Sequence, residues 1–274
     1  MGELESIFDT ADQPSYPLPD SLKRGYGGPL GFSEPVLYGN FVASLDGVVA
    51  IDAVPHVGAI LSGGSSADRF VMGLLRACAD AVLIGAGTLR ASPDSCWTPE
   101  YAYPDAAADY AELRRRLGRA PHPRLVVVQG GGGLDFSHPG LSRGGLILTT
   151  EVGRRRLPRQ LPDSIDAHVL GDDRIDLARL RPALEAGGHR VVLSEAGPNL
   201  TGQLLGRSLL DELFLTLSSL IAGEPAGGWR PGFAAGVALL PGRRLAARVL
   251  SVRHHDEQIF LRYRLPSVSM AAVN

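Results

Sequence analysis

The chain has 274 residues, of which 45% are hydrophobic and 20% are charged, a composition typical of a globular protein with a sizeable core. A formal net charge of −2 gives no electrostatic reason to expect a nucleic-acid partner or a membrane-surface partner. The sequence has no apolar run long enough to span a membrane and no signal-peptide pattern, so we expect a cytoplasmic protein.

The pattern changes character at Pro35. Residues 1–34 are rich in Pro, Gly, Asp and Ser and show little periodicity, so we expect a surface arm or a partly disordered segment. Residues 36–43 predict a strand, and the turn signal Asp46-Gly47 predicts a second short strand over 48–51.

After this point, short apolar strands alternate with helical patterns. Helices are predicted from a cap at Ser65 to Cys78, and over residues 105–117 and 177–184. Strands are predicted over residues 81–84, 125–129, 146–150, 167–170, 191–194 and 212–217, and a closing hairpin over 245–252 and 258–265. The order predicts one α/β domain with a mostly parallel central sheet, flanked by helices, and a C-terminal antiparallel hairpin.

The stretch 191–205 combines a strand, a tight turn and the start of a helix. Glu195 ends the apolar run, and Gly197 and Pro198 suit the entry into a first helical turn. Unpaired backbone N–H groups and the helix dipole favour anions at such a terminus. The stretch is therefore either a phosphate cradle with Glu195 at its lip or an ordinary turn between strand and helix, and the local pattern fits both.

Three segments rich in glycine or small polar residues follow predicted strands, at 85–88, 130–133 and 195–199. Ligands of open α/β sheets bind beyond the carboxyl ends of the strands, so we expect one extended site that suits a dinucleotide. None of the segments matches the Rossmann fingerprint or a phosphate-binding loop ending in Gly-Lys-Ser/Thr. The sequence also lacks an HExxH pattern and a serine-hydrolase elbow, so we expect no catalytic metal and no nucleophilic serine.

Two charged residues near these segments each have two interpretations. Asp46 is either the first residue of an Asp-Gly turn or a strand-end carboxylate that binds a polar substrate. Arg76 is either a surface arginine at the end of an apolar helical face or a bidentate clamp for an anion.

Four motifs in order carry a resemblance to a known family. They are Phe41-Val42-Ala43-Ser44-Leu45-Asp46-Gly47, Leu74-Leu75-Arg76-Ala77, Ala79-Asp80-Ala81-Val82-Leu83-Ile84-Gly85-Ala86-Gly87-Thr88 and Ser194-Glu195-Ala196-Gly197-Pro198-Asn199-Leu200. Residues 35–265 thereby resemble the reductase domain of the bifunctional riboflavin-biosynthesis deaminase/reductase and the stand-alone pyrimidine reductases. The resemblance implies a dihydrofolate-reductase-like fold, preceded by an extension over 1–34 and followed by a tail over 266–274.

The resemblance also implies NADPH as cofactor, hydride transfer to the ribose-derived C1 of 5-amino-6-(5-phosphoribosylamino)uracil, and a homodimer. It assigns cofactor contacts to Val42, Gly85, Gly87, Thr88, Gln129, Gly197, Pro198, Asn199, Leu200 and Thr201. It assigns substrate contacts to Asp46, Arg76 and Glu195, with the substrate phosphate as the partner of Arg76. Because such a reduction consumes a proton as well as a hydride, Asp46 and Glu195 are the candidate catalytic acids.

The chain departs from the family pattern at three places. Ser92-Pro93 stands where an acidic residue is usual, Gln129 stands where a small hydroxyl side chain is common, and residues 58–62 lack a frequent Trp. The deaminase motif is also absent. Because these changes fall at cofactor and substrate contacts, two other functions stay open: an NADPH-dependent reductase of dihydrofolate, a pterin or a secondary metabolite, and a non-catalytic nucleotide-binding protein.

Overall fold

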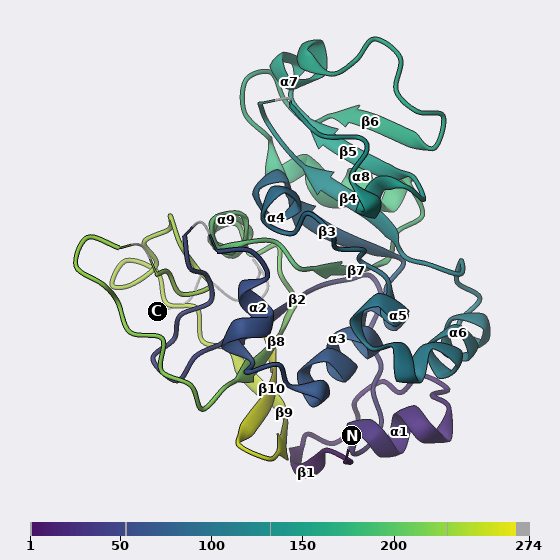
Figure 1. Ribbon diagram of the computed structural model, residues 1–274, viewed down its shortest axis with the longest axis vertical. Coiled ribbons are helices and arrows are strands. Elements are labelled where there is room, and N and C mark those ends of the chain that lie inside the picture. Colours follow the sequence, from purple (N-terminus) through teal and green to yellow (C-terminus); the bar gives the residue numbers. More distant parts are fainter. Residues whose placement is uncertain (1, 53, 132, 229, 267–274) are drawn as a thin grey trace.

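A ten-stranded sheet forms the centre of the protein (Figure 1). The computed structural model describes residues 2–52, 54–131, 133–228 and 230–266. The strand order is β1-β9-β10-β8-β2-β7-β3-β4-β5-β6. The strands are β1 (Glu5–Asp9), β2 (Val36–Ala43), β3 (Ala81–Gly85), β4 (Arg124–Val128), β5 (Gly145–Thr149), β6 (Ile165–Val169), β7 (Val191–Ser194), β8 (Glu212–Leu217), β9 (Arg248–His255) and β10 (Gln258–Arg264).

Seven neighbouring strands, from β8 to β6, run parallel to one another. β10 pairs antiparallel with β8, β9 with β10, and β1 with β9, which makes one side of the sheet an antiparallel extension. The predicted fold class, a mostly parallel sheet closed by an antiparallel hairpin, is therefore confirmed. Because the parallel strands point the same way, their carboxyl ends share one edge of the sheet, where ligands of α/β folds bind.

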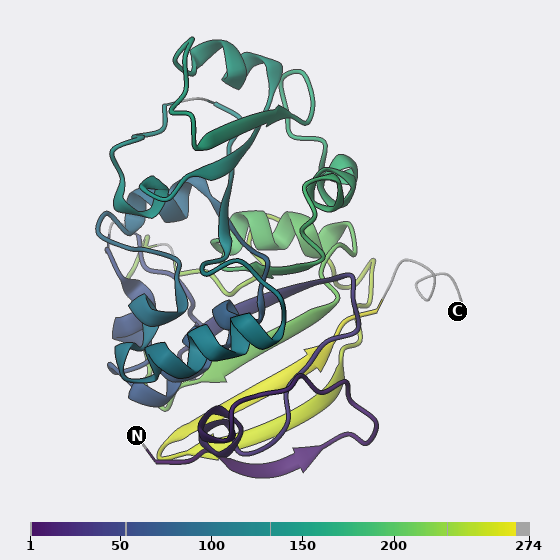
Figure 2. The same ribbon diagram turned by 90° about the vertical axis from the view of Figure 1, so that its right-hand side faces the viewer.

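Helices cover both faces of the sheet (Figure 2). The helices are α1 (Asp20–Tyr26), α2 (Val57–Leu61), α3 (Ser66–Cys78), α4 (Ala86–Ala91), α5 (Pro99–Ala102), α6 (Ala107–Arg116), α7 (Glu151–Arg156), α8 (Leu180–Ala186) and α9 (Pro198–Gly206), with short 3-10 helices η1 (Pro104–Ala106), η2 (Pro139–Leu141) and η3 (Leu177–Arg179). Apolar side chains of α3 and α6 form a first core, and those of α8 and α9 form a second. β7 contributes to both, because Val191 and Leu193 belong to the first core and Val192 to the second.

The longest helix, α3, lies against the sheet and is fixed at its start. The Ser65 hydroxyl oxygen accepts the backbone N–H of Asp68 at 3.2 Å, which is the predicted cap. Leu74 and Leu75 are fully buried, as their helical spacing predicts. The Leu75 carbonyl accepts a hydrogen bond from the Tyr38 hydroxyl of β2 at 2.7 Å, so α3 is tied to the sheet as well as packed on it.

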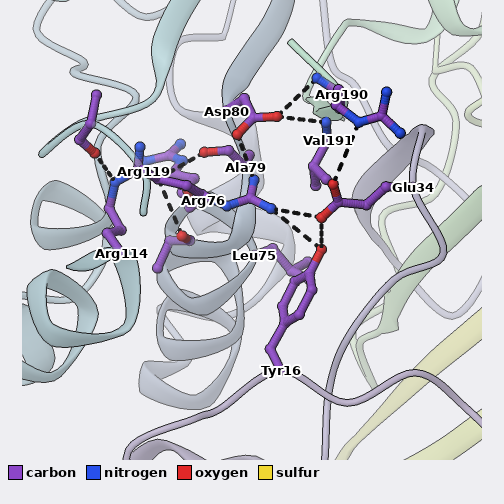
Figure 3. Close-up of polar contacts among 12 residues, drawn as sticks. Tyr16, Glu34, Leu75, Arg76, Ala79, Asp80, Arg114, Arg119, Arg190 and Val191 are labelled. Carbon is purple, nitrogen blue, oxygen red and sulfur yellow. Dashed lines mark hydrogen bonds and ion pairs between the residues drawn. The ribbon is translucent and has the colours of Figure 1, made fainter. Parts of the chain in front are cut away.

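Arg114 of α6 caps the other end of α3. Its Nη1 donates to the carbonyls of Arg76, Ala77 and Ala79 at 3.2, 3.2 and 2.7 Å (Figure 3). The last carbonyls of a helix carry partial negative charge, which a guanidinium complements. Burial lowers the pKa of Arg114 to about 10, a value that keeps it charged at neutral pH. The cap therefore holds the last turn of α3, where Arg76 lies.

The expectation of a surface arm over residues 1–34 is corrected by the structure. β1 extends the sheet beside β9, and the segment that follows packs into the first core. Its buried apolar residues are Leu4, Leu18, Leu22, Tyr26, Leu30 and Phe32. These residues are irregularly spaced and become buried only because the segment wraps the finished sheet, so sequence periodicity did not reveal them.

A polar network joins this N-terminal segment to the amino ends of β3 and β7 (Figure 3). Arg119 donates to Asp80 at 2.8 Å and to Glu34 at 3.1 Å. Tyr16 also donates to Glu34, at 2.8 Å, and Asp80 accepts the backbone N–H of Val191 at 2.8 Å. Because the network lies at the amino edge of the parallel strands, away from the ligand-binding edge, we assign it a structural role.

Two other segments differ from the prediction. Residues 48–51 form no strand; the Val49 N–H donates to the Pro231 carbonyl, at 3.0 Å, in the long segment between β8 and β9. The expected glycine-rich loop after β3 is helical from residue 86 onward, as α4. The expected C-terminal tail lies outside the described residues from residue 267 on. No helix within the described ranges has the length and apolar character needed to cross a bilayer.

The buried N-terminal segment should contribute measurably to stability. Leu22→Ala removes a side chain that is 1% exposed, so we expect the free energy of unfolding to fall by about 2–5 kcal/mol. Ile7→Ala, at a side chain that is 61% exposed, is the matched control and should change it by less than about 0.5 kcal/mol. Urea unfolding checks both. Equal effects of the two variants would show that the segment unfolds independently of the core.

Candidate active site

The three segments expected to form one site do meet at the carboxyl edge. They follow β3, β4 and β7, which are neighbours in the order β7-β3-β4. The starts of α4 and α9 are joined directly, because the backbone N–H of Gly197 donates to the Thr88 hydroxyl at 3.0 Å. Thr88 therefore links two of the predicted segments across β7 and β3.

The N-terminus of α9 presents backbone donors beside this link. The first N–H groups of a helix have no partner within the helix, and Pro198 at the first position has none to offer. Asn199 and Leu200 follow on the more exposed side of the turn. Pro198 and Thr201 are buried instead, and the Thr201 hydroxyl donates to the Ala196 carbonyl at 3.2 Å. These two residues shape the turn, so we expect Gly197, Asn199 and Leu200 to face a ligand.

Glycines leave open space along the same edge. A side-chain carbon placed on Gly87 or Gly131 would meet no atom within 4 Å, and one on Gly85 would come to 3.7 Å from Leu200. A ligand can therefore approach the backbone closely there, as the pyrophosphate of a dinucleotide requires. Gln129, at the end of β4, is 5% exposed, and its backbone N–H is taken by the Leu148 carbonyl at 2.9 Å. The residues present thus fit a dinucleotide.

Arg76 and Glu195 form a buried ion pair at this edge. Nε and Nη2 of Arg76 donate to the two Glu195 carboxylate oxygens at 2.9 and 2.7 Å. The Arg76 side chain is 6% exposed and that of Glu195 is 11% exposed. Nη1 of Arg76 donates to the carbonyls of Cys96 and Thr98 at 3.3 and 3.2 Å. These bonds use four of the five guanidinium N–H donors, so Arg76 orients Glu195.

Asp46 is held by its own turn and by a distant loop. Its carboxylate accepts the Ser44 hydroxyl at 2.5 Å and the backbone N–H groups of Ala222 and Gly223 at 3.0 and 2.7 Å. These bonds, the Ser44 bond foremost, lower the pKa of Asp46 to about 2. The structure therefore shows the turn interpretation of Asp46, and its carboxylate in addition anchors a second segment, whereas substrate binding by Asp46 stays a prediction. A carboxyl with such a pKa carries no proton at neutral pH.

Sequence reasoning missed the burial of Asp68. Asp68 lies in the first turn of α3, near Thr216 of β8, and is 7% exposed. Thr216 is in register with Val42 of β2, a predicted cofactor contact. Burial, with a smaller contribution from the charge of Glu195, raises the pKa of Asp68 to about 6. An acidic residue in a first helical turn is ordinary, so only the packing of α3 on β8 reveals its burial.

The carboxyl edge gathers hydrogen-bonding and titratable groups. Among the residues that the structure describes, no three His, Cys, Asp or Glu side chains are grouped as metal ligands. The edge offers a helix N-terminus with backbone donors, an oriented carboxylate and a buried carboxyl, Asp68, whose pKa burial raises to about 6.

Comparisons with known proteins place this arrangement in a family. A model of the RibD C-terminal domain matches residues 35–238. The chain belongs to this family. The match covers the parallel strands and every residue of the candidate site, and it confirms the family expected from the sequence motifs. The antiparallel edge strands β1, β9 and β10 lie outside the matched range of the RibD C-terminal domain.

One curated relative is the 2,5-diamino-6-ribosylamino-4(3H)-pyrimidinone 5′-phosphate reductase of Archaeoglobus fulgidus, which is 25% identical over 191 residues, or 69% of this chain and 82% of the relative. Among solved structures, a pyrimidine reductase-like protein from Corynebacterium diphtheriae has a TM-score of 0.61 at 20% identity and covers 85% of this chain and 92% of its own. The riboflavin biosynthesis reductase of Saccharomyces cerevisiae has a TM-score of 0.58 at 17% identity, with 91% and 96% covered. These structures support the fold of the RibD C-terminal domain.

The Arg76–Glu195 ion pair should stabilise the folded state because each buried charge compensates the other. Arg76→Ala leaves the Glu195 carboxylate buried without its cation, so we expect the free energy of unfolding to fall by about 3–5 kcal/mol. The double variant Arg76→Ala/Glu195→Ala removes both charges and should lose less than the sum of the two single losses. Denaturant unfolding measures this cycle, and strict additivity would contradict the coupling.

The Asp46 anchor should weaken in acid. Its folded pKa of about 2 lies below the ordinary value of 3.8, so its stabilising contribution is present above about pH 4 and disappears as the pH falls towards 2. The difference in melting temperature between the wild type and Asp46→Asn should therefore shrink between pH 5 and pH 3. Thermal unfolding across this range measures it, and a constant difference would show that the Asp46 charge is not involved.

Proposed function

We propose that this chain is an oxidoreductase that reduces a ribosylamino-pyrimidine phosphate, with NADPH as the hydride source. Membership of the RibD C-terminal domain family and the named activity of the Archaeoglobus relative support the reaction class. The observation that carries the proposal within this chain is the buried Arg76–Glu195 pair beside the open N-terminus of α9. That edge brings together an anion-binding terminus and an oriented carboxylate.

The cofactor would lie along the α9 side of the edge. Backbone donors of Asn199 and Leu200 suit its pyrophosphate, and Gly87 leaves room for close approach. Val42 lies on β2 near the same edge. When bound, a nicotinamide dinucleotide supplies a hydride. The protein's own tasks are to hold the acceptor carbon of the substrate close to the transferred hydride, to exclude water and to deliver one proton.

Glu195 is the residue we assign to the substrate ring. An aminopyrimidine presents N–H donors, and each Glu195 oxygen keeps a second lone pair after its bond to Arg76. Arg76 fixes the rotamer of Glu195, and the carbonyls of Cys96 and Thr98 fix Arg76 in turn. We therefore assign Arg76 as a positioning residue, in place of the phosphate contact expected from the resemblance.

Asp46 serves the site by holding the loop that follows β8. Its carboxylate bonds to the Ala222 and Gly223 N–H groups keep that loop beside the end of β2. Its low pKa does not suit proton donation, so we assign it a positioning role rather than that of an acid. The homodimer and the cytoplasmic location expected from the sequence stay predictions.

The function is tested by NADPH oxidation with the purified chain. The substrates to offer are 5-amino-6-(5-phosphoribosylamino)uracil, its 2,5-diamino-pyrimidinone counterpart and dihydrofolate. We expect turnover of one of the ribosylamino compounds and none of dihydrofolate. Turnover of dihydrofolate alone would replace the proposed substrate class, and a protein that binds NADPH without oxidising it under any of these conditions would be a nucleotide-binding protein instead.

Glu195→Gln tests the substrate contact. The amide keeps the shape of the side chain but loses the charge-assisted hydrogen bonds, so we expect kcat/KM for the pyrimidine to fall about 10- to 100-fold. The dissociation constant of NADPH, measured by fluorescence, should stay within about twofold. An unchanged kcat/KM would remove Glu195 from the substrate site.

A further inference from the structure

We propose that Arg156 of α7 binds the 2′-phosphate of the cofactor and thereby selects NADPH over NADH, an inference that rests on the proposed reductase function. The two dinucleotides differ only in this phosphate on the adenosine ribose. A chain that prefers NADPH therefore needs a cation at the place where that ribose lies. Arg156 lies outside the sequence motifs that carry the family resemblance, and it is assigned from its contact with the segment after β4.

The order of the strands indicates where the adenosine end of the cofactor would lie. The hydride must meet the substrate, which we assign to Glu195 at the end of β7, and the backbone donors of α9 follow directly. β2, with Val42, lies on one side of β7, and β3 and β4 lie on the other. With the nicotinamide on the Val42 side, the adenosine extends over β3 and β4, where Gly87 and Gly131 leave the backbone open. Neighbouring strands are about 4.8 Å apart, so β4 is about 10 Å from β7, within the reach of one dinucleotide.

α7 is packed closely on the segment that follows β4. The Thr150 hydroxyl donates to the Gly130 carbonyl at 2.8 Å and accepts the Gly153 N–H at 2.9 Å. A side-chain carbon on Gly153 would come within 2.7 Å of that carbonyl oxygen, so this approach requires glycine. At the other end of the helix, Nη1 of Arg156 donates to the Gly131 carbonyl at 2.9 Å. The helix therefore holds the Arg156 guanidinium against the open backbone of Gly131.

The Arg156 guanidinium keeps donors for an anion. Its side chain is exposed, and the bond to Gly131 uses one of its five N–H groups. Among the described residues, no acidic side chain forms an ion pair with Arg154, Arg155 or Arg156. The last turn of α7 thus presents positive charge beside the segment after β4. A phosphate accepts two parallel hydrogen bonds from a guanidinium, which makes arginine suited to this contact.

Other groups at this edge fit the 2′-phosphate less well. Gln129 ends β4, but it is 5% exposed and its backbone N–H donates to the Leu148 carbonyl. Arg76 is buried and uses its donors on Glu195 and on two backbone carbonyls. Arg90 lies in the last turn of α4, whereas Arg156 is bonded to the segment after β4 itself. Arg156 is therefore the cation that the structure fixes at the open backbone.

The test is the binding of NADPH and of NADH to the purified chain, measured by fluorescence titration. We expect the wild type to bind NADPH roughly tenfold or more tightly than NADH. Arg156→Ala should raise the Kd of NADPH about 10- to 100-fold, because charge-assisted hydrogen bonds to the phosphate are lost, and leave the Kd of NADH within about twofold. Adenosine 2′,5′-bisphosphate and AMP, offered as competitors, should show the same difference, because they carry the adenosine end without the nicotinamide.

Three further variants separate the phosphate contact from general effects of charge and of folding. Arg90→Ala and Arg24→Ala each remove an exposed arginine from the last turn of a helix, α4 and α1 respectively, and should keep the wild-type preference for NADPH. Arg156→Lys keeps the positive charge without the planar fork, so it should recover part of the NADPH affinity. Cooperative unfolding should be retained in all of them, because the side chains are exposed.

Equal losses of NADPH and NADH affinity in Arg156→Ala would show that Arg156 only shapes the segment after β4, and would overturn the proposal. An unchanged preference for NADPH in that variant would overturn it as well. A wild type that prefers NADPH but reduces none of the offered pyrimidines would overturn the proposed reaction and leave the Arg156 contact in place. A wild type that reduces a pyrimidine equally well with NADH would overturn the role of Arg156 and leave the reaction class. Failure to bind either dinucleotide would overturn both.

Discussion

The arrangement of the site depends on one buried ion pair, Arg76–Glu195. Removing two charges from water costs free energy, and the pair is tolerated because its geometry is bidentate and the remaining Arg76 donors reach backbone carbonyls. The pair joins the end of α3 to the end of β7, and Arg114 holds that end of α3 from the other side. The orientation of the Glu195 carboxylate therefore depends on a chain of contacts that starts in α6.

The two edges of the parallel sheet have different tasks. At the amino edge, Arg119 donates to Asp80 and to Glu34, and Tyr16 also donates to Glu34, so these groups tie the N-terminal segment to the sheet. At the carboxyl edge, Gly87 and Gly131 leave the backbone open, and α9 presents its first N–H groups. The ion network thus fixes the N-terminal segment at one edge, whereas the glycines leave the backbone open at the other.

Three acidic residues near the carboxyl edge differ in role because their partners differ. Asp46 accepts three hydrogen bonds at the surface and remains a carboxylate, which suits an anchor. Glu195 faces a guanidinium and remains a hydrogen-bond acceptor. Asp68 is buried, and this burial raises its pKa to about 6. The three carboxyl groups therefore differ in their bonding because their surroundings differ.

The sequence by itself determined the order of the seven parallel strands, the closing hairpin and the three segments at one edge, because periodicity and turn residues are local properties. It also drew attention to Glu195 and Arg76, but not to their pairing, since 119 residues separate them. Only the tertiary structure decided that apolar residues of the N-terminal segment, such as Leu22 and Tyr26, belong to the core and that Asp68 is buried. Burial and the partners of a charge depend on which distant strands and helices pack together, and that information is absent from any short stretch of the chain.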